Sequence, residues 1–262
     1  METPGDPRAL SASQLKYLAC FFMVIDHIGM LFEPMSAFAG PDSLLFYAFR
    51  YLGRIAFPVF AYFAAEGCRR TSNYRRYLLR LGIFGLVTHL VALLATGGEN
   101  GSVIATFFLS ALAVWLYRQL RERSLSPAVA LLPSVALALL GALTRVDYGW
   151  LGVVLVVALY LCGESRNRKL LVLGAFMAFH YLVQQPLESL LTYGPGMTAP
   201  ALLHWYGGFL LPFGLLCTFF ALLSLPLLRG YRGERGRGNR WFFYWFYPIH
   251  LAALYGLSLL VP

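Results

Sequence analysis

Long apolar runs alternate with short polar stretches along the whole chain. A helix of about 20 residues is needed to cross the ~30 Å hydrocarbon core of a bilayer, and most of the runs approach that length. Backbone polar groups in lipid must find partners within the segment, and the alternation typical of barrel strands is absent, so each run is predicted to be a helix. Nine segments are expected, near residues 15–32, 46–68, 77–94, 103–117, 128–143, 148–161, 170–183, 202–228 and 241–260.

Basic residues mark alternate connections between these segments. Because Lys and Arg are retained on the cytoplasmic side, the pattern predicts a cytoplasmic amino terminus and a carboxyl terminus outside. Of the 21 basic residues, 18 follow it: Arg8, Lys16, Arg69, Arg70, Arg75, Arg76, Arg80, Arg118, Arg121, Arg123, Arg166, Arg168, Lys169, Arg229, Arg232, Arg235, Arg237 and Arg240. The intervening connections carry Glu33, Asp42, Glu99, Asp147 and Glu188, with Arg145 against the trend.

Composition supports a membrane protein and argues against nucleic acid as a partner. Hydrophobic residues make up 59% of the chain, charged residues 13%, and the mean hydropathy is +0.64. The formal charge of +9 is spread over short runs between apolar segments, and no basic soluble face is formed. We therefore expect one all-α transmembrane bundle over residues 1–262, a multi-pass protein of the cytoplasmic (inner) membrane with the lipid bilayer around it.

The stretch 229–240 is rich in Gly and Arg and contains the basic residues that follow the eighth segment. Its simplest interpretation is a cytoplasmic connector. The alternative is contact with anionic lipid or with the phosphates of a cofactor.

The first segment contains two adjacent ionisable residues, Asp26 and His27. A charge at bilayer depth costs at least ~2.5–3.5 kcal/mol, which makes each one a functional candidate. Lys16 lies 11 positions before His27, which is about three helical turns and nearly the same face. Histidine is also the residue best suited to accept a proton near neutral pH. The alternative is that Asp26 and His27 only pair with neighbouring helices.

The second segment carries Arg50 and Arg54 one turn apart, with Glu66 near its end. Gly53 would allow close approach of another helix or a ligand, and Pro58 predicts a kink where the charge of Arg54 lies. Arg54 must have an anionic partner in lipid. That partner can be Asp26, Glu66 or a ligand, and a purely structural ion pair remains an alternative.

The last segment brings Tyr247, Pro248 and His250 together in an aromatic stretch. The combination indicates a polar pocket, with a satisfied core histidine as the alternative. In the predicted topology, all five histidines fall between the membrane midplane and the outer surface. The motifs of serine hydrolases, zinc proteases and nucleotide motors are absent, and the four cysteines have no metal-ligand spacing, so no metal is expected.

Several of these stretches resemble the TraX family of membrane proteins. The resemblance rests on five motifs, which are Leu15-Lys16 with Asp26-His27-Ile28-Gly29, Gly53-Arg54-Ile55-Ala56-Phe57-Pro58, Glu66-Gly67, Thr71-Ser72-Asn73-Tyr74-Arg75-Arg76-Tyr77 and Tyr244-Trp245-Phe246-Tyr247-Pro248-Ile249-His250-Leu251. It covers the first third and the last segment, and the middle matches only as apolar spans. The family implies acetyl transfer, because its best-known member acetylates the amino terminus of pilin.

The chain also resembles, more distantly, the acyltransferase-three superfamily. That superfamily carries a basic residue, ten further residues and then an essential histidine in its first helix. Lys16 and His27 have this spacing here, with Lys in place of the usual Arg. A lysine ammonium cannot make the forked contacts of a guanidinium.

The resemblance implies acetyl-CoA as the acyl donor, and it completes a set of predicted site residues. His27 is the expected general base, oriented by Asp26, with Arg54 stabilising the oxyanion. Glu66 completes the catalytic set, while Tyr247 and His250 line the substrate pocket. The expected contacts of the donor are Lys16, Arg50, Arg69, Arg70, Asn73, Arg75 and Arg76.

Other functions remain open at this stage. A proton- or ion-coupled transporter would use the same buried residues, although no inverted repeat is visible. A scaffold for a surface-assembly complex is a third interpretation. For an acyltransferase, the acceptor can be the amine of a pilin-like peptide or an amine or hydroxyl of a cell-surface glycan. The oligomeric state has no signal in the sequence.

Overall fold

The computed structural model describes residues 10–32, 44–98 and 101–260. Within these ranges the regular elements are all helices, joined by short connections, with one isolated bridge between Leu10 and Tyr231. Four residues used in the predicted topology, Arg8, Glu33, Asp42 and Glu99, lie outside the described ranges.

Helices occupy all nine stretches in which apolar segments were predicted. In chain order they are α1 (Ala12–Phe32), α3 (Leu44–Gly53), α4 (Ala56–Arg70), α5 (Tyr74–Ala95), α6 (Val103–Glu122), α7 (Pro127–Leu143), α8 (Gly149–Leu161), α9 (Arg166–Phe179), η1 (His180–Gln184), α10 (Gln185–Tyr193), α11 (Ala199–Trp205), η2 (Tyr206–Leu210), α12 (Leu211–Leu222), α13 (Ser224–Arg229) and α14 (Arg240–Ser258).

Six helical stretches of the described part, some made of consecutive elements, are long and apolar enough to cross a membrane: Ala12–Leu31, Leu44–Arg70, Tyr74–Ala95, Val103–Glu122, Arg166–Tyr193 and Ala199–Arg229. α7 and α8 are shorter apolar helices. Their presence establishes an all-helical protein with several candidate membrane spans. The number of nine crossings and the placement of the two termini stay predictions.

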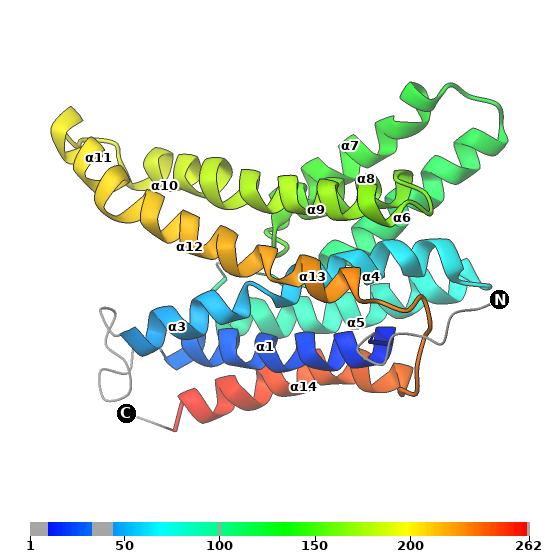
Figure 1. Cartoon of the computed structure of the whole chain (residues 1–262), viewed down its shortest axis with the longest axis horizontal. Coiled ribbons are helices and arrows are strands. Elements are labelled where there is room, and N and C mark those ends of the chain that lie inside the picture. The colour runs from blue at the N-terminus through cyan, green and yellow to red at the C-terminus, as the bar shows by residue number, and fades with distance from the viewer. Residues whose placement is uncertain (1–9, 33–43, 99–100, 261–262) are drawn as a thin grey trace.

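The first and last helices of the chain lie side by side. Figure 1 shows α14 along α1, with α3 and α5 beside them, and α1 also packs against α4. α5 packs against both α6 and α14, while α6, α7 and α8 pack against one another. α4 contacts α1, α6 and α8, so it is central to the bundle. Residues from the two ends of the sequence therefore meet inside one bundle.

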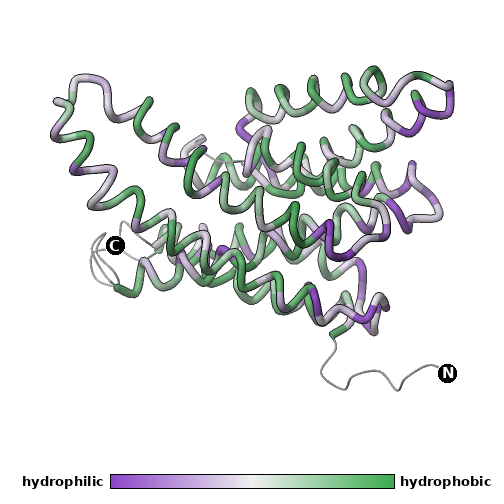
Figure 2. The backbone as a smooth tube through the Cα atoms, turned by 45° about the horizontal axis from the view of Figure 1, so that its top comes forward, coloured by the Kyte–Doolittle hydropathy of each residue, from purple (hydrophilic) through white to green (hydrophobic). Residues whose placement is uncertain are grey.

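The basic connections gather at one end of the bundle, here called the basic end. In Figure 1 the connections after α4, α6, α8 and α13 all lie on the same side as the start of α1. Figure 2 shows hydrophilic residues concentrated there, while the residues of the helices between the ends are mostly hydrophobic. The chain therefore runs back and forth, with its arginine-rich connections together.

The connection between α13 and α14 is fixed against the start of α1. The backbone N–H of Ala12 donates to the carbonyl oxygen of Glu234 at 2.9 Å, and that of Ser13 donates to Arg235 at 3.0 Å. The Ser13 hydroxyl donates to the same Arg235 oxygen at 2.8 Å. These bonds satisfy N–H groups that a helix start leaves free. They also hold Arg235 beside the first helix.

Two irregular turns interrupt helices close to the site described below. α3 ends at Gly53 and α4 begins at Ala56, so the predicted kink lies at Arg54, one turn before Pro58. A β-carbon on Gly53 would lie 2.2 Å from Cβ of Asp26, which explains why α1 and α3 can approach so closely only at a glycine. The second irregular turn is η1, a π-helical turn between α9 and α10.

The helix predicted at 170–183 extends much further than expected. α9, η1 and α10 run without a break from Arg166 to Tyr193, because the chain remains helical through Gln184 and Glu188. Those polar residues ended the apolar run in the sequence. In the structure they line a cavity.

Candidate functional site

Of the candidates predicted as anionic partner of Arg54, Asp26 is the one that contacts it in the structure. Nη2 of Arg54 lies 2.6 Å from Oδ1 of Asp26, and Nη1 of Arg50 lies 2.9 Å from the same oxygen. Nε of Arg54 donates to the carbonyl oxygen of Arg50 at 2.8 Å, across the helix break. These three side chains, here called the Asp26 cluster, hold one carboxylate and two guanidiniums. The cluster therefore keeps one net positive charge inside the bundle.

His27 is held by His250 and not by Asp26, which corrects the predicted orientation. Adjacent helix residues point about 100° apart, so Asp26 faces α3 while His27 faces α14. Nδ1 of His27 lies 2.7 Å from Nε2 of His250, and Nδ1 of His250 lies 2.7 Å from the carbonyl oxygen of Phe246. The two imidazoles stack with centroids 5.0 Å apart.

The direction of these hydrogen bonds fixes which nitrogen of His27 is basic. A carbonyl oxygen can only accept, so Nδ1 of His250 carries a hydrogen. In a neutral His250, Nε2 must then accept from Nδ1 of His27. The hydrogen of a neutral His27 is thus on Nδ1, and Nε2 keeps the lone pair. This is the tautomer that a general base at Nε2 requires.

The Asp26 cluster and His27 line one cavity of about 480 Å³, here called the histidine cavity. Tyr247 of α14 lines it as well, as predicted for a substrate pocket. His250, which was also predicted to line the pocket, is not in the wall of either cavity and contacts His27 instead. Further polar residues of its wall come from the 144–148 connection and from the helix around η1, and they are Arg145, Asp147, Tyr148, His180, Gln184, Gln185 and Glu188.

A second histidine, His180, faces the same cavity and was not selected from the sequence. Nε2 of Gln184 donates to Oε1 of Glu188 at 2.9 Å, which leaves Oε1 of Gln184 to accept from Nδ1 of His180 at 3.2 Å. This series of hydrogen bonds starts in the π-helical turn η1, and such turns occur often at functional sites. The i, i+4, i+8 spacing of His180, Gln184 and Glu188 is the signal that the sequence offered.

Asp147 adds a carboxyl group that titrates near neutrality. It lies in the connection between α7 and α8, accepts a hydrogen bond from the backbone N–H of Tyr148 at 3.0 Å, and has no cation within ion-pair distance in the described part of the chain. Removal from water raises the pKa of its carboxyl to about 6, although Arg54 opposes the shift. The charge of the histidine cavity therefore changes around that pH.

A second cavity of about 210 Å³, here called the lysine cavity, lies toward the basic end of α1 and α14. Lys16 lines it, with its ammonium over the rings of Phe63 at 5.1 Å and Phe243 at 5.6 Å. The remaining wall is mostly apolar and includes Cys20, Met23, Phe60, Ala64, Tyr77, Phe107, Tyr244 and Tyr247.

Three cations of the lysine cavity lack an anionic partner within residues 10–32, 44–98 and 101–260. Lys16, Arg235 and Arg240 all line it, and none makes an ion pair among the described residues. Arg235 and Arg240 belong to the Gly/Arg-rich stretch, for which phosphate contact was the alternative interpretation. Cations without carboxylate partners around an apolar cavity favour a ligand with an anionic head and a narrow apolar arm.

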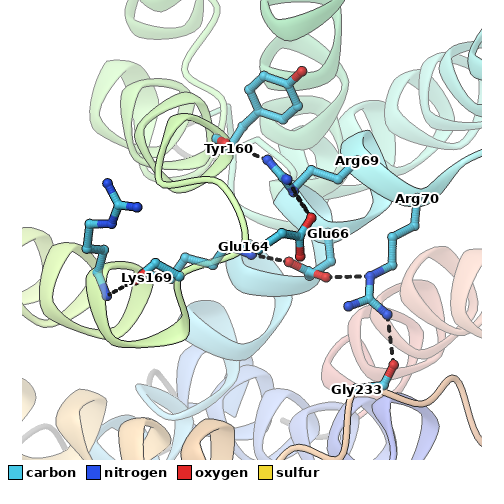
Figure 3. Close-up of polar contacts among 9 residues, drawn as sticks. Glu66, Arg69, Arg70, Tyr160, Glu164, Lys169 and Gly233 are labelled. Carbon is cyan, nitrogen blue, oxygen red and sulfur yellow. Dashed lines mark hydrogen bonds and ion pairs between the residues drawn. The ribbon is translucent and has the colours of Figure 1, made fainter.

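Glu66 lies in a separate ion cluster, apart from the predicted catalytic residues. Its carboxylate contacts Nζ of the buried Lys169, and Nε of Arg70 lies 2.7 Å from Oε2 (Figure 3). Nη1 of Arg70 also donates to the carbonyl oxygen of Gly233 at 2.7 Å. This Glu66 cluster joins α4 to α9 and to the 230–239 connection. Glu66 lines neither of the two cavities.

The other predicted donor contacts are dispersed. Arg50 lies in the Asp26 cluster and faces the histidine cavity, not the basic end. Arg69 pairs with Glu164 at 2.5 Å, and Asn73 caps α5 by accepting from the N–H of Arg76 at 2.9 Å. Arg75 lines an open apolar groove between α5 and α6. Of the predicted set, Lys16 alone lines the lysine cavity.

Comparison with known proteins supports the resemblance seen in the motifs. The family described as "TraX protein" matches residues 11–258. A relative from Dichelobacter nodosus, described as "Probable fimbrial assembly protein FimC, serogroup H1", is 28% identical over 260 residues, covering 93% of this chain and 94% of the relative. No solved structure matches the chain.

Proposed function

Because the chain belongs to the TraX family, we propose that it is a membrane-bound acyltransferase that moves an acetyl group from acetyl-CoA to an acceptor at the cell surface. The acceptor is an amine or hydroxyl of a peptide or glycan. The relative described as a fimbrial assembly protein favours a subunit of a surface fibre, such as a pilin-like amino terminus. The bundle would lie in the inner membrane with its basic end toward the cytoplasm.

The observation that carries this proposal is the lysine cavity with its three cations, none of which makes an ion pair within the part of the chain that the structure describes. Lys16, Arg235 and Arg240 would bind the phosphates of acetyl-CoA, and the apolar wall would take its narrow pantetheine arm. Lys16, Cys20 and Met23 line the cavity along one face of α1, and His27 is the next residue on that face. The arm would therefore deliver its thioester close to His27.

In the proposed reaction, Nε2 of His27 takes the proton of the acceptor N–H or O–H. The nucleophile bonds to the acetyl carbonyl carbon, the C–S bond breaks, and the thiolate of CoA leaves and takes up the proton. His250 holds His27 in the tautomer that this step needs. The net positive charge of the Asp26 cluster would stabilise the oxyanion that forms on the acetyl oxygen.

The proposal is tested by transfer of labelled acetyl from acetyl-CoA in membranes that contain the protein. His27→Ala should lower transfer on the order of 10²–10⁴-fold, because it removes the general base. His204→Ala is the matched control, since His204 is exposed and lines neither cavity, and it should transfer at the wild-type rate. Full transfer by a folded His27→Ala variant would exclude the assignment.

Binding of CoA separates the proposal from the transporter interpretation. The purified acyltransferase should be stabilised against heat by CoA through its affinity for the folded state. A transporter that uses only the histidine cavity has no reason to bind CoA. Absence of a thermal shift at millimolar CoA would favour the transporter.

A further inference from the structure

Tyr247 stands at the junction of the two cavities. It lines both the lysine cavity and the histidine cavity. Its neighbours on the same face of α14 do not: Tyr244 lines only the lysine cavity, and Leu251 lines only the histidine cavity. Residues spaced by three and four positions share a helix face. The face of α14 therefore passes from one cavity to the other at Tyr247.

α1, which packs against α14, also lines the lysine cavity with one residue and the histidine cavity with the next residue on the same face. Met23 lines the lysine cavity, and His27, one turn later in α1, lines the histidine cavity. The ring centroid of Tyr247 lies 5.6 Å from that of His27, with the rings nearly perpendicular. The inner end of the lysine cavity thus lies beside the imidazole of His27, with the Tyr247 ring at its junction with the histidine cavity.

The Tyr247 ring is held in place from several sides. It is only 6% exposed and packs edge-to-face against His250 as well, with centroids 5.3 Å apart. The two imidazoles are themselves joined by a hydrogen bond of 2.7 Å. The ring cannot turn away without disturbing the histidine pair, so it is a fixed side of the junction between the two cavities.

We propose that Tyr247 is the residue that limits the acyl donor to a short chain. The inference rests on the proposed function, in which a CoA thioester occupies the lysine cavity. A thioester that reaches the level of Met23 and His27 leaves its acyl group against the Tyr247 ring. An acetyl group ends there with one methyl, whereas each further methylene must displace a packed ring.

Removal of the ring would widen the junction between the two cavities. The histidine cavity, of about 480 Å³, would then receive a longer acyl chain. A closed apolar wall discriminates by roughly 10-fold or more for an added methylene. The preference for acetyl should therefore depend on the ring of Tyr247 and not on its hydroxyl.

The experiment measures the dissociation constants of acetyl-CoA, butyryl-CoA and hexanoyl-CoA for the purified full-length protein, without an acceptor. The wild type should bind hexanoyl-CoA roughly 10-fold or more weakly than acetyl-CoA. Tyr247→Ala should bring the two constants within about twofold, through tighter binding of hexanoyl-CoA. Tyr247→Phe keeps the ring and should keep the wild-type ratio.

Tyr244→Ala is the matched control, because it opens the lysine cavity one turn away from the junction. It should leave the acetyl preference unchanged. If Tyr247→Ala does not fold, Tyr247→Leu takes its place in the experiment. This variant should bind butyryl-CoA as tightly as acetyl-CoA while still binding hexanoyl-CoA more weakly.

Two results would overturn the inference while leaving the proposed function intact. One is equal binding of acetyl-CoA and hexanoyl-CoA by the wild type, and the other is the same relaxed preference in Tyr244→Ala as in Tyr247→Ala. If the wild type binds neither CoA nor any of its thioesters, the proposed function fails and this inference fails with it.

Discussion

Two carboxylates inside the bundle each face two cations, yet their surroundings differ. Asp26 binds Arg50 and Arg54 beside a cavity lined by histidines. Glu66 binds Arg70 and Lys169 where α4, α9 and the 230–239 connection meet, and it lines neither the histidine cavity nor the lysine cavity. Charge burial alone therefore does not identify a reactive site. The useful distinction is whether the buried charge faces space that a substrate can occupy.

The largest expected effect concerns stability and belongs to the Glu66 cluster. Glu66→Ala leaves the ammonium of Lys169, which is 2% exposed, without its carboxylate. Breaking a buried pair in this way should lower the free energy of unfolding by about 3–5 kcal/mol. Chemical unfolding in detergent measures it.

The matched control for that prediction removes both charges. Glu66→Met combined with Lys169→Met should recover most of the lost stability, because apolar side chains of similar volume often replace a buried ion pair without cost. Loss of acetyl transfer in a well-folded double variant would mean that Glu66 has a chemical role. The distinction between the two clusters would then fail.

The second effect is on rate and belongs to the Asp26 cluster. Arg54→Gln removes the net positive charge beside His27, and loss of one group that stabilises an oxyanion costs about 10²–10³-fold in kcat. Arg70→Gln makes the same change in the Glu66 cluster and should leave kcat within about threefold of wild type. Labelled acetyl transfer at saturating acetyl-CoA measures both variants. Equal losses would show that the clusters act alike.

The sequence predicted the positions of the helices well, because long apolar runs between charged connections leave few other arrangements in lipid. Gly53 and Pro58 also indicated the helix break and a close approach by another helix or a ligand, and in the structure α1 makes that approach. Asp26 was among the candidate partners of Arg54. These features depend on residues within one helix or between helices that follow each other in the chain.

The pairs that could not be predicted join distant parts of the chain. His27 and His250 are 223 positions apart, and Glu66 and Lys169 are 103 apart. Their contacts depend on which helices are neighbours, and apolar patterns do not specify that order. His180 was overlooked for a related reason, because its role is visible only once Gln184 and Glu188 continue the helix along the cavity wall.

Asp147 offers a smaller test, through pH. Its carboxyl is harder to ionise in the folded protein, with a pKa of about 6, than in the unfolded chain, where it is near 3.8. The folded state therefore binds the proton more tightly. Asp147 lowers the free energy of unfolding least below about pH 4 and most above about pH 6. Asp147→Asn, which keeps an oxygen for the N–H of Tyr148, should stabilise the protein by about 1–3 kcal/mol at pH 7.5.

The gain from Asp147→Asn should shrink steadily between pH 6 and pH 4. Thermal unfolding of both proteins across this range measures it. A gain that is equal at pH 4.5 and pH 7.5 would mean that Asp147 does not titrate in the histidine cavity. Asp26 would then be the main carboxyl of that cavity with an electrostatic role.

The smallest expected effect links the two regions, because the Glu66 cluster holds the connection that carries Arg235. Arg70 bonds the carbonyl oxygen of Gly233, two residues before Arg235, and Arg235 lines the lysine cavity. Arg235→Gln should weaken CoA binding about fivefold, the loss expected for one exposed charge pair, and the difference should fade at high salt. Arg237→Gln is the control, since Arg237 is also exposed but lines neither cavity. If both variants weaken CoA equally, the connection attracts the donor only through its total charge, and the Glu66 cluster has no specific part in positioning a phosphate contact.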